Sequence, residues 1–140
     1  KGREVIASLG KGNPTLGTLA ALQLAKAQAE SGKRDDAIAT LRNLRDLDAD
    51  LRPIVRERLA RLLIDAGKAK EALPLLDDDK NPLMLDVRGD ARFALGERSQ
   101  AQKDYLKALA LVDVGDPQHR LITLKLIEAG GTPPHTEDKT

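Results

Sequence analysis

The side chains that could do chemistry are few and widely separated in this sequence of 140 residues. His119 falls at the start of a predicted helix and His135 in a polar tail, so the two histidines form neither a metal site nor an acid–base pair. The run Asp77–Asp78–Asp79 lacks the alternating ligands and the glycine of a calcium loop, and we interpret it as a solvated connector. The sequence has no cysteine, which excludes thiolate zinc sites and a cysteine nucleophile.

The remaining candidates for catalysis or phosphate binding are equally isolated. Ser8, Ser31 and Ser99 lie at predicted loops or helix ends, with no neighbouring base to activate a hydroxyl group. The segment GKGNPTLGT contains glycines but lacks the Gly-Lys-Ser/Thr signature of a phosphate-binding loop. We therefore expect a protein that is not an enzyme and that carries no cofactor and no metal.

The charge balance gives no reason to expect a nucleic acid or an anionic membrane surface as a partner. There are 23 Lys and Arg residues against 22 Asp and Glu residues, for a net charge of +1. No apolar run reaches the roughly 18 to 20 residues needed to span a bilayer. Because the sequence begins at Lys1 rather than Met, we expect residues 1–13 to be a lead-in segment from which an N-terminal anchor has been removed.

The elements that must position any functional side chain are predicted to be helices. Aromatic residues make up 1% of the sequence, so the core must be built from Leu, Ala, Ile and Val, which suits close helix packing. Apolar residues recur at helical spacing between proline and glycine boundaries. The predicted helices run from Pro14 to a stop at Gly32, and then over 35–47, 52–66, 68–76, 83–95, 98–112 and 118–129, with Asp50 and Asp116 as N-caps.

The helices are predicted to repeat in pairs. The helix-ending glycines Gly32, Gly67 and Gly96 are separated by 35 and 29 residues, and three further sets of positions keep the same spacing. Small residues allow two antiparallel helices to approach closely, so two of these sets mark helix crossings, and a bulky residue follows four positions later. The sets are Ala25, Ala60 and Gly89 before the glycines, Ala37, Ala72 and Ala101 after them, and Leu41, Leu76 and Tyr105 as the bulky positions.

This spacing is similar to that of the tetratricopeptide repeat, a helix–turn–helix unit of about 34 residues. The third unit, residues 88–111, matches it best, whereas the 29-residue step and Pro74 shorten the fourth helix. We predict an all-α fold, a tetratricopeptide-like α-solenoid of three helix pairs plus a C-terminal capping helix over residues 14–130. Residues 131–140 have no apolar content and are predicted to be a disordered tail.

A protein-binding face is predicted on the first helix of each pair, which lines the concave side of such repeats. The register combines charged and apolar positions, so the groove could hold an extended peptide or a partner helix, with Phe93 as an apolar anchor. The alternative is that Phe93 packs inside its own repeat and that the charges form a solvated face. The predicted partner-binding residues are Lys26, Glu30, Glu57, Arg61, Asp65, Asp86, Asp90 and Phe93.

One subtype of binding groove is not supported by the sequence. Clamps for a C-terminal carboxylate use asparagine side chains together with lysines, because a carboxylate needs several convergent donors. Asn13, Asn43 and Asn81 are the only asparagines, and none lies on a predicted inner helix. A carboxylate clamp is therefore not expected.

The order of local motifs resembles a particular family. The segments GTLAALQLA, RLARLL and VRGD, together with the closing HRLITLKLIEAGG, resemble YfgM, the ancillary subunit of the bacterial SecYEG translocon, over residues 15–130. The resemblance implies a periplasmic tetratricopeptide-like domain that is anchored in the inner membrane by one N-terminal helix. It also implies association with the SecYEG translocon and with a membrane-anchored periplasmic chaperone of the PpiD type. The tail at 131–140 is not part of the resemblance.

Two other functions stay open at this point. The first is a soluble tetratricopeptide adaptor or co-chaperone that recognises a peptide motif. The second is a self-associating module such as a homodimer. In it, Pro74 and the short fourth helix leave a surface that a second copy of the chain covers. In the main hypothesis, the domain is a scaffold that links the translocon to a periplasmic chaperone.

Overall fold

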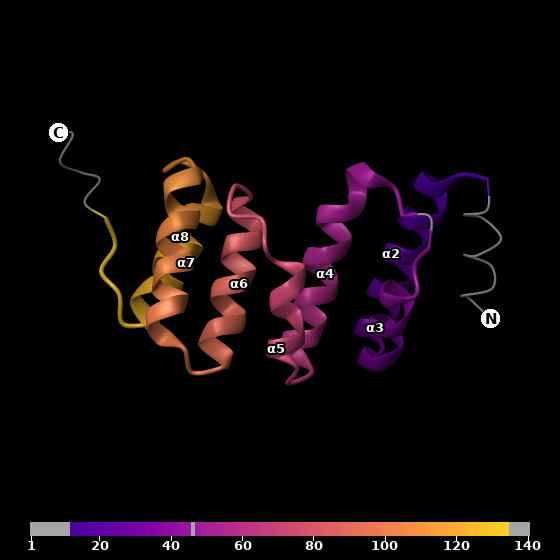
Figure 1. Ribbon diagram of the computed structural model, residues 1–140, viewed down its shortest axis with the longest axis horizontal. Helices are drawn as coiled ribbons and strands as arrows, with labels where there is room; N and C mark the ends of the chain where they lie inside the picture. The colour runs from indigo at the N-terminus through magenta and orange to yellow at the C-terminus, as the bar shows by residue number, and fades with distance from the viewer. Residues whose placement is uncertain (1–11, 46, 135–140) are drawn as a thin grey trace. The chain divides into compact units, whose positions relative to one another are not determined.

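The computed structural model describes residues 12–45 and 47–134, and every regular element within them is helical (Figure 1). The predicted all-α fold is therefore confirmed for this part of the chain. Most of the predicted lead-in at 1–13, and residues 135–140 of the predicted tail, lie outside the described residues. The helices are α2 (Pro14–Glu30), α3 (Arg34–Arg42), η1 (Ala49–Leu51), α4 (Arg52–Asp65), α5 (Ala69–Ala72), η2 (Leu73–Leu75), α6 (Pro82–Ala94), α7 (Arg98–Leu111) and α8 (Pro117–Glu128).

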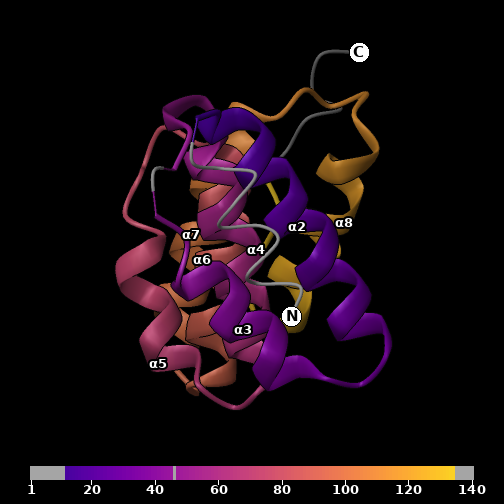
Figure 2. The same cartoon turned by 90° about the vertical axis from the view of Figure 1, so that its right-hand side faces the viewer.

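The helices group into two compact units. The first unit, Lys1–Lys68, contains α2, α3, η1 and α4, and the second, Ala69–Thr140, contains α5, η2, α6, α7 and α8. Figures 1 and 2 both show α2 beside α3, with a short turn between them, and α6 and α7 form the corresponding hairpin of the second unit. The hairpins α2–α3 and α6–α7 are thus the first and third predicted helix pairs.

Three helices begin with the same combination of a polar N-cap and a following proline. Asn13, Asn81 and Asp116 each accept a hydrogen bond from a backbone N–H of the first helical turn, at 3.1, 2.9 and 2.9 Å. The next residue is a proline in each case, which suits the first turn because its missing N–H has no intrahelical partner. The side chains of Asn13 and Asn81 are therefore occupied as helix caps.

The turns inside the helix pairs depend on glycine. The three predicted helix-ending glycines adopt φ values of 78 to 80°, in the left-handed region that other residues rarely enter. A fourth glycine, Gly130, has φ 92° and ends α8 in the same way. The helix stops read from the sequence are thus confirmed at Gly32, Gly67 and Gly96.

The second predicted helix is shorter than expected. It was predicted to run to about residue 47, but α3 ends at Arg42. The reason is tertiary: the backbone N–H of Asp48 donates to Thr18 Oγ1 at 3.2 Å, and Thr15 Oγ1 donates to the Asp48 carboxylate, so the connector is held against the start of α2. The prediction that Asp50 caps the following helix is also wrong, because the N-cap of α4 is Leu51, which makes no side-chain cap bond. Asp48 instead caps η1 by accepting from the N–H of Asp50 at 2.8 Å.

The short fourth helix is confirmed. It consists of one α-helical turn, α5, followed by the 3₁₀ turn η2, which contains Pro74. Its end is held by Arg88 of α6, whose Nη1 donates to the carbonyl of Leu76 at 3.2 Å. Arg88 also forms a two-pronged ion pair with Asp104 of α7, at 2.9 and 3.1 Å. One guanidinium group therefore joins the shortened segment to the hairpin that follows it.

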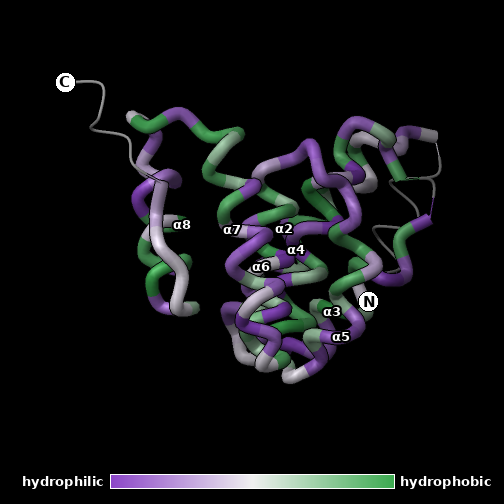
Figure 3. Tube along the Cα trace, turned by 60° about the vertical axis from the view of Figure 1, so that its left-hand side comes forward, coloured by the Kyte–Doolittle hydropathy of each residue, from purple (hydrophilic) through white to green (hydrophobic). Residues whose placement is uncertain are grey.

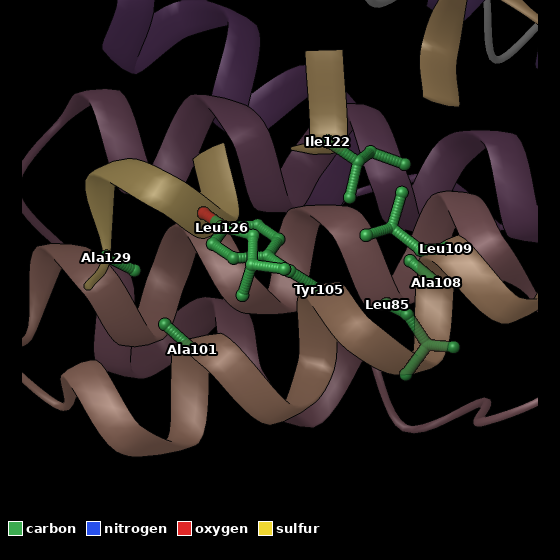
Figure 4. Close-up of a cluster of buried hydrophobic side chains, with 8 residues drawn as sticks. All are labelled: Leu85, Ala101, Tyr105, Ala108, Leu109, Ile122, Leu126 and Ala129. Atoms are coloured by element: carbon green, nitrogen blue, oxygen red, sulfur yellow. The ribbon is translucent and has the colours of Figure 1, made fainter. Parts of the chain in front are cut away.

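The close approach of α6 to α7 is centred on Gly89. A Cβ atom at this position would lie 2.4 Å from Cε1 of Tyr105, so only glycine fits beside the ring. Residues of α8 join those of the hairpin in one apolar core (Figure 4). The core residues are Leu85, Ala101, Tyr105, Ala108, Leu109, Ile122, Leu126 and Ala129.

Candidate functional site

A groove of about 680 Å³ lies in the first unit, along α2 and α4. Leu41 of α3 and Leu51 of η1 form part of its wall, and apolar side chains cover most of its surface. Four of the eight predicted partner-binding residues, Lys26, Glu30, Arg61 and Asp65, lie on its rim. The other lining residues are Leu19, Leu22, Gln23, Ala25, Ala29, Ile54, Arg58 and Leu62.

The groove combines exposed aliphatic groups with charges of both signs. Leu19 is 46% exposed and Ile54 is 37% exposed, a high degree for two large aliphatic residues that line the same concave surface. Lys26 and Glu30 are exposed one helical turn apart on α2. Such a surface can bury the apolar side of a peptide or helix while its rim contacts polar groups.

The charged residues of α4 are partly held in place by the unit itself. Arg61 Nε donates to the Glu57 carboxylate one turn earlier in the helix, and the predicted site residue Glu57 is buried. The carbonyl of Asp65 accepts a hydrogen bond from Arg34 of α3. Glu57 therefore positions Arg61 and does not itself line the groove.

Asp86 and Asp90 of α6 have a different environment from the one predicted. Asp86 is fully buried, and its carboxylate accepts from Lys125 Nζ at 3.0 Å and from Gln118 Nε2 at 2.9 Å. Asp90 accepts from the same Nζ at 3.0 Å and from the Tyr105 hydroxyl at 2.5 Å. Both carboxylates thus join α6 to α8 inside the second unit, and a contact of either with a partner stays a prediction.

Sequence reasoning missed Lys125 and Gln118 as the partners of these carboxylates. Lys125 stands directly before the buried Leu126, so its stem runs beside the core while the ammonium group reaches the two aspartates. The only signal in the sequence was a lone lysine next to the buried stripe of the last helix. Nothing in the spacing of α6 and α8 identified which acidic residues it would meet.

Burial sets the proton affinities of this cluster. Desolvation raises the pKa of Asp90 above its ordinary value of 3.8, against the lowering effect of the Tyr105 hydrogen bond and the Lys125 charge. Burial lowers the pKa of Lys125, but the Asp90 and Asp86 carboxylates outweigh it and leave the pKa raised. Burial and the hydrogen bond to Asp90 also raise the pKa of Tyr105, so its hydroxyl stays a donor. The lysine is therefore charged across the ordinary pH range.

We expect the Asp90 carboxyl to titrate above pH 3.8 in the folded chain, whereas that of Asp79 titrates below it, because Arg88 bonds and attracts the Asp79 carboxylate. An acid with a raised folded pKa binds more protons when folded, so the stability that Asp90 contributes grows as pH falls through this window and declines as pH rises. Side-chain carboxyl NMR across pH 2 to 7 measures both midpoints. Equal midpoints for the two residues would contradict the expected difference in environment.

Phe93 packs within its own unit. Its ring is partly buried against the core of the second unit, and the guanidinium of Arg98 lies 5.1 Å from the ring centroid. This is the alternative that the sequence left open for Phe93, and the role of Phe93 as a partner's anchor stays a prediction.

Neither a metal-binding cluster nor a membrane-spanning helix is found in the part of the chain that the structure describes. Its histidine, aspartate and glutamate residues do not gather into a group of three or more that could hold a metal ion. Over residues 12–45 and 47–134, none of the helices combines the length and the apolar character that crossing a membrane requires.

Comparisons with known proteins agree with this geometry. An ancillary SecYEG translocon subunit of Escherichia coli (strain K12) is 32% identical over 94 residues, which cover 63% of this chain and 46% of that protein. The chain thus spans about half the length of this relative, and the resemblance drawn from the sequence is confirmed. The NMR structure of the first TPR domain of the human RPAP3 protein matches with a TM-score of 0.63 over 81% of this chain and 94% of that domain; its sequence is 23% identical, so this likeness shows the fold alone.

The match to a protein family covers more of this chain than either of the two individual proteins does. Residues 3–131 match the family of tetratricopeptide repeat-like domains, which covers both units and every helix described above. Families of this fold are protein-interaction scaffolds that present concave binding surfaces. By the extent of this match, the chain belongs to the tetratricopeptide repeat-like domain family.

Proposed function

We propose that this domain is a non-enzymatic scaffold that binds a segment of a partner protein in the groove along α2 and α4. The observation that carries the proposal is the exposure of Leu19 and Ile54 in a concave surface whose rim bears charges of both signs. Exposed aliphatic groups in a concavity gain about 25 cal/mol for each Å² of apolar surface that a ligand covers. The bound segment is an extended peptide or a helix with one apolar side.

We further propose that the partner belongs to the Sec translocon or to a chaperone that works beside it. The support is the similarity to an ancillary SecYEG translocon subunit of Escherichia coli, a protein named for its association with the translocon. In this proposal the domain lies on the periplasmic side of the inner membrane, where it links the translocon to a membrane-anchored periplasmic chaperone. The full-length protein would provide the membrane anchor.

The groove is tested by the change Leu19→Asp. It should lower the affinity for the partner at least tenfold, which is about 1.4 kcal/mol, because a carboxylate would have to lose its water against apolar groups. Leu16→Asp is a matched control, since Leu16 lies one turn earlier in α2, is 45% exposed and does not line the groove. The measurement is co-purification of translocon and chaperone subunits with each full-length variant from solubilised membranes, with circular dichroism to verify folding.

The possible outcomes separate the parts of the proposal. Loss of both partners with Leu19→Asp, but not with Leu16→Asp, supports groove binding at the translocon. If the unmodified protein recovers neither translocon nor chaperone, the assignment to the Sec machinery is wrong, and a soluble adaptor function is then the better hypothesis. Equal recovery with both variants would exclude the groove while leaving the assignment intact.

A further inference from the structure

The last helix, α8, has an apolar side that the second unit does not cover. Ile122, Leu126 and Ala129 are buried in the core, at 0 to 1% exposure. At 100° per residue, Leu121, Leu124 and Ile127 fall on the opposite side of the helix, and they are 52, 57 and 50% exposed. Figure 3 shows hydrophobic residues interleaved with hydrophilic ones along α8 beyond its hydrophilic first turn.

We name this exposed side the outer stripe (Leu121, Leu124 and Ile127). A repeat helix whose outer side is left uncovered normally carries polar residues there. The three side chains of the outer stripe are each half exposed or more in the structure, and they lie side by side on one face of the helix. A contiguous apolar face of this kind is a candidate docking surface.

The charges beside the outer stripe indicate which occupant it takes. Arg120 and Glu128 are both exposed, and each lies four residues from Leu124, one on either side. Leu121 and Ile127 likewise lie three residues before and after Leu124. If two α8 helices pack antiparallel, with Leu124 opposite Leu124, each Leu121 lies level with Ile127 of the second copy and each Arg120 lies level with Glu128 of the second copy.

We propose that two copies of this chain associate through α8, antiparallel about a two-fold axis that passes beside Leu124. The stripe is complementary to itself in charge, as a two-fold interface requires, because one surface must match its own copy. A parallel arrangement would instead place Arg120 beside Arg120 and Glu128 beside Glu128, which is repulsive. This surface belongs to α8, a different element from η2 with Pro74, at which the sequence suggested self-association.

The interface should be weak in solution. A 12-residue helix is about 18 Å long, and a single pair of such helices covers less than the roughly 1,200 Å² of a typical stable complex. We therefore expect dissociation constants on the order of 100 µM in dilute solution. Attachment of the full protein to a membrane would raise the effective concentration and favour the pair.

Cysteine cross-linking tests the arrangement directly, because the chain has no cysteine of its own. Leu124→Cys alone should form a disulfide-linked dimer under mild oxidation, since the two positions meet at the axis within the roughly 7 Å that a disulfide spans between Cα atoms. Arg120→Cys alone should not, because its two copies lie about 12 Å apart along the helices. A mixture of the Arg120→Cys and Glu128→Cys chains should link one to the other. Leu16→Cys, similarly exposed on α2, is the control for random collision.

Charge reversal gives an independent measurement by sedimentation equilibrium or light scattering. Arg120→Glu should weaken the dimer at least tenfold, and the double change Arg120→Glu with Glu128→Arg should restore it, because the exchanged charges again face each other. The proposal is overturned if Leu124→Cys links no faster than Leu16→Cys, or if Arg120→Cys links to itself, which indicates parallel helices. A chain that stays monomeric at millimolar concentration also overturns it. If Leu124→Asp then abolishes co-purification of a different protein with this chain, the stripe binds a helix of that protein instead of a second copy.

Discussion

Replacing Lys125 with methionine should lower the free energy of unfolding of the second unit by about 3 kcal/mol. The lysine ammonium group lies 3.0 Å from a carboxylate oxygen of Asp86, which is fully buried, and 3.0 Å from one of Asp90, so its loss removes a positive charge that both aspartates share inside the unit. Methionine keeps most of the length and the apolar stem, so the change isolates the charge. Urea unfolding followed by circular dichroism measures the difference.

The control for this change is Lys107→Met. Lys107 pairs with Asp79 at 3.7 Å, but both side chains are more than half exposed, so its loss should cost less than about 0.5 kcal/mol. Adding Asp86→Asn to Lys125→Met should recover part of the stability, because a neutral amide no longer needs a counter-charge. If Lys125→Met and Lys107→Met have the same effect, the cluster does not hold α8 in place.

The second large effect is expected from Gly89→Ala, which should destabilise the second unit by about 1–3 kcal/mol. The added methyl group would lie 2.4 Å from the ring of Tyr105, at the point where α6 and α7 cross, so the hairpin must open or the ring must move. The corresponding positions of the first two repeats carry an alanine and a leucine, namely Ala25 with Leu41 and Ala60 with Leu76. Each repeat thus combines a small residue with a matching bulky one.

A double-mutant cycle tests this matching of sizes. Gly89→Ala should cost much less in a chain that also carries Tyr105→Leu, because leucine leaves room for the methyl group, and we expect a coupling of about 1–2 kcal/mol. Gly115→Ala is the control, since a Cβ atom there would meet nothing within 4 Å. Additive effects of Gly89→Ala and Tyr105→Leu would show that the two side chains do not limit each other.

The fold could be predicted from the sequence because local signals agree with the tertiary packing. Proline after a polar cap begins helices, glycine ends them, and small residues at repeating spacings mark the crossings. The end of α3 could not be predicted, because it depends on the bond from Asp48 to Thr18, 30 residues away in the sequence. Helix periodicity contains no information about such contacts.

The candidate site was predictable only in part, for a related reason. The register predicts that Lys26, Glu30 and Arg61 share one face, since positions on successive first helices align when repeats stack, and all three line one groove in the structure. That a partner binds there stays a prediction. The same register placed Asp86 on that face, but a lysine from the terminal helix binds it inside the second unit. A helix that lies beyond the last complete repeat has no equivalent in the pattern, so its contacts could be found only in the structure.

The placement of Tyr105 has a consequence for optical spectroscopy. It is the only tyrosine, the chain has no tryptophan, and the only phenylalanine is Phe93, so every aromatic ring belongs to the second unit. Tyrosine emission and near-ultraviolet dichroism therefore follow that unit alone, whereas the far-ultraviolet signal follows the helices of both. The two curves coincide only if both units unfold in one cooperative step, so a single unlabelled sample distinguishes joint from separate unfolding.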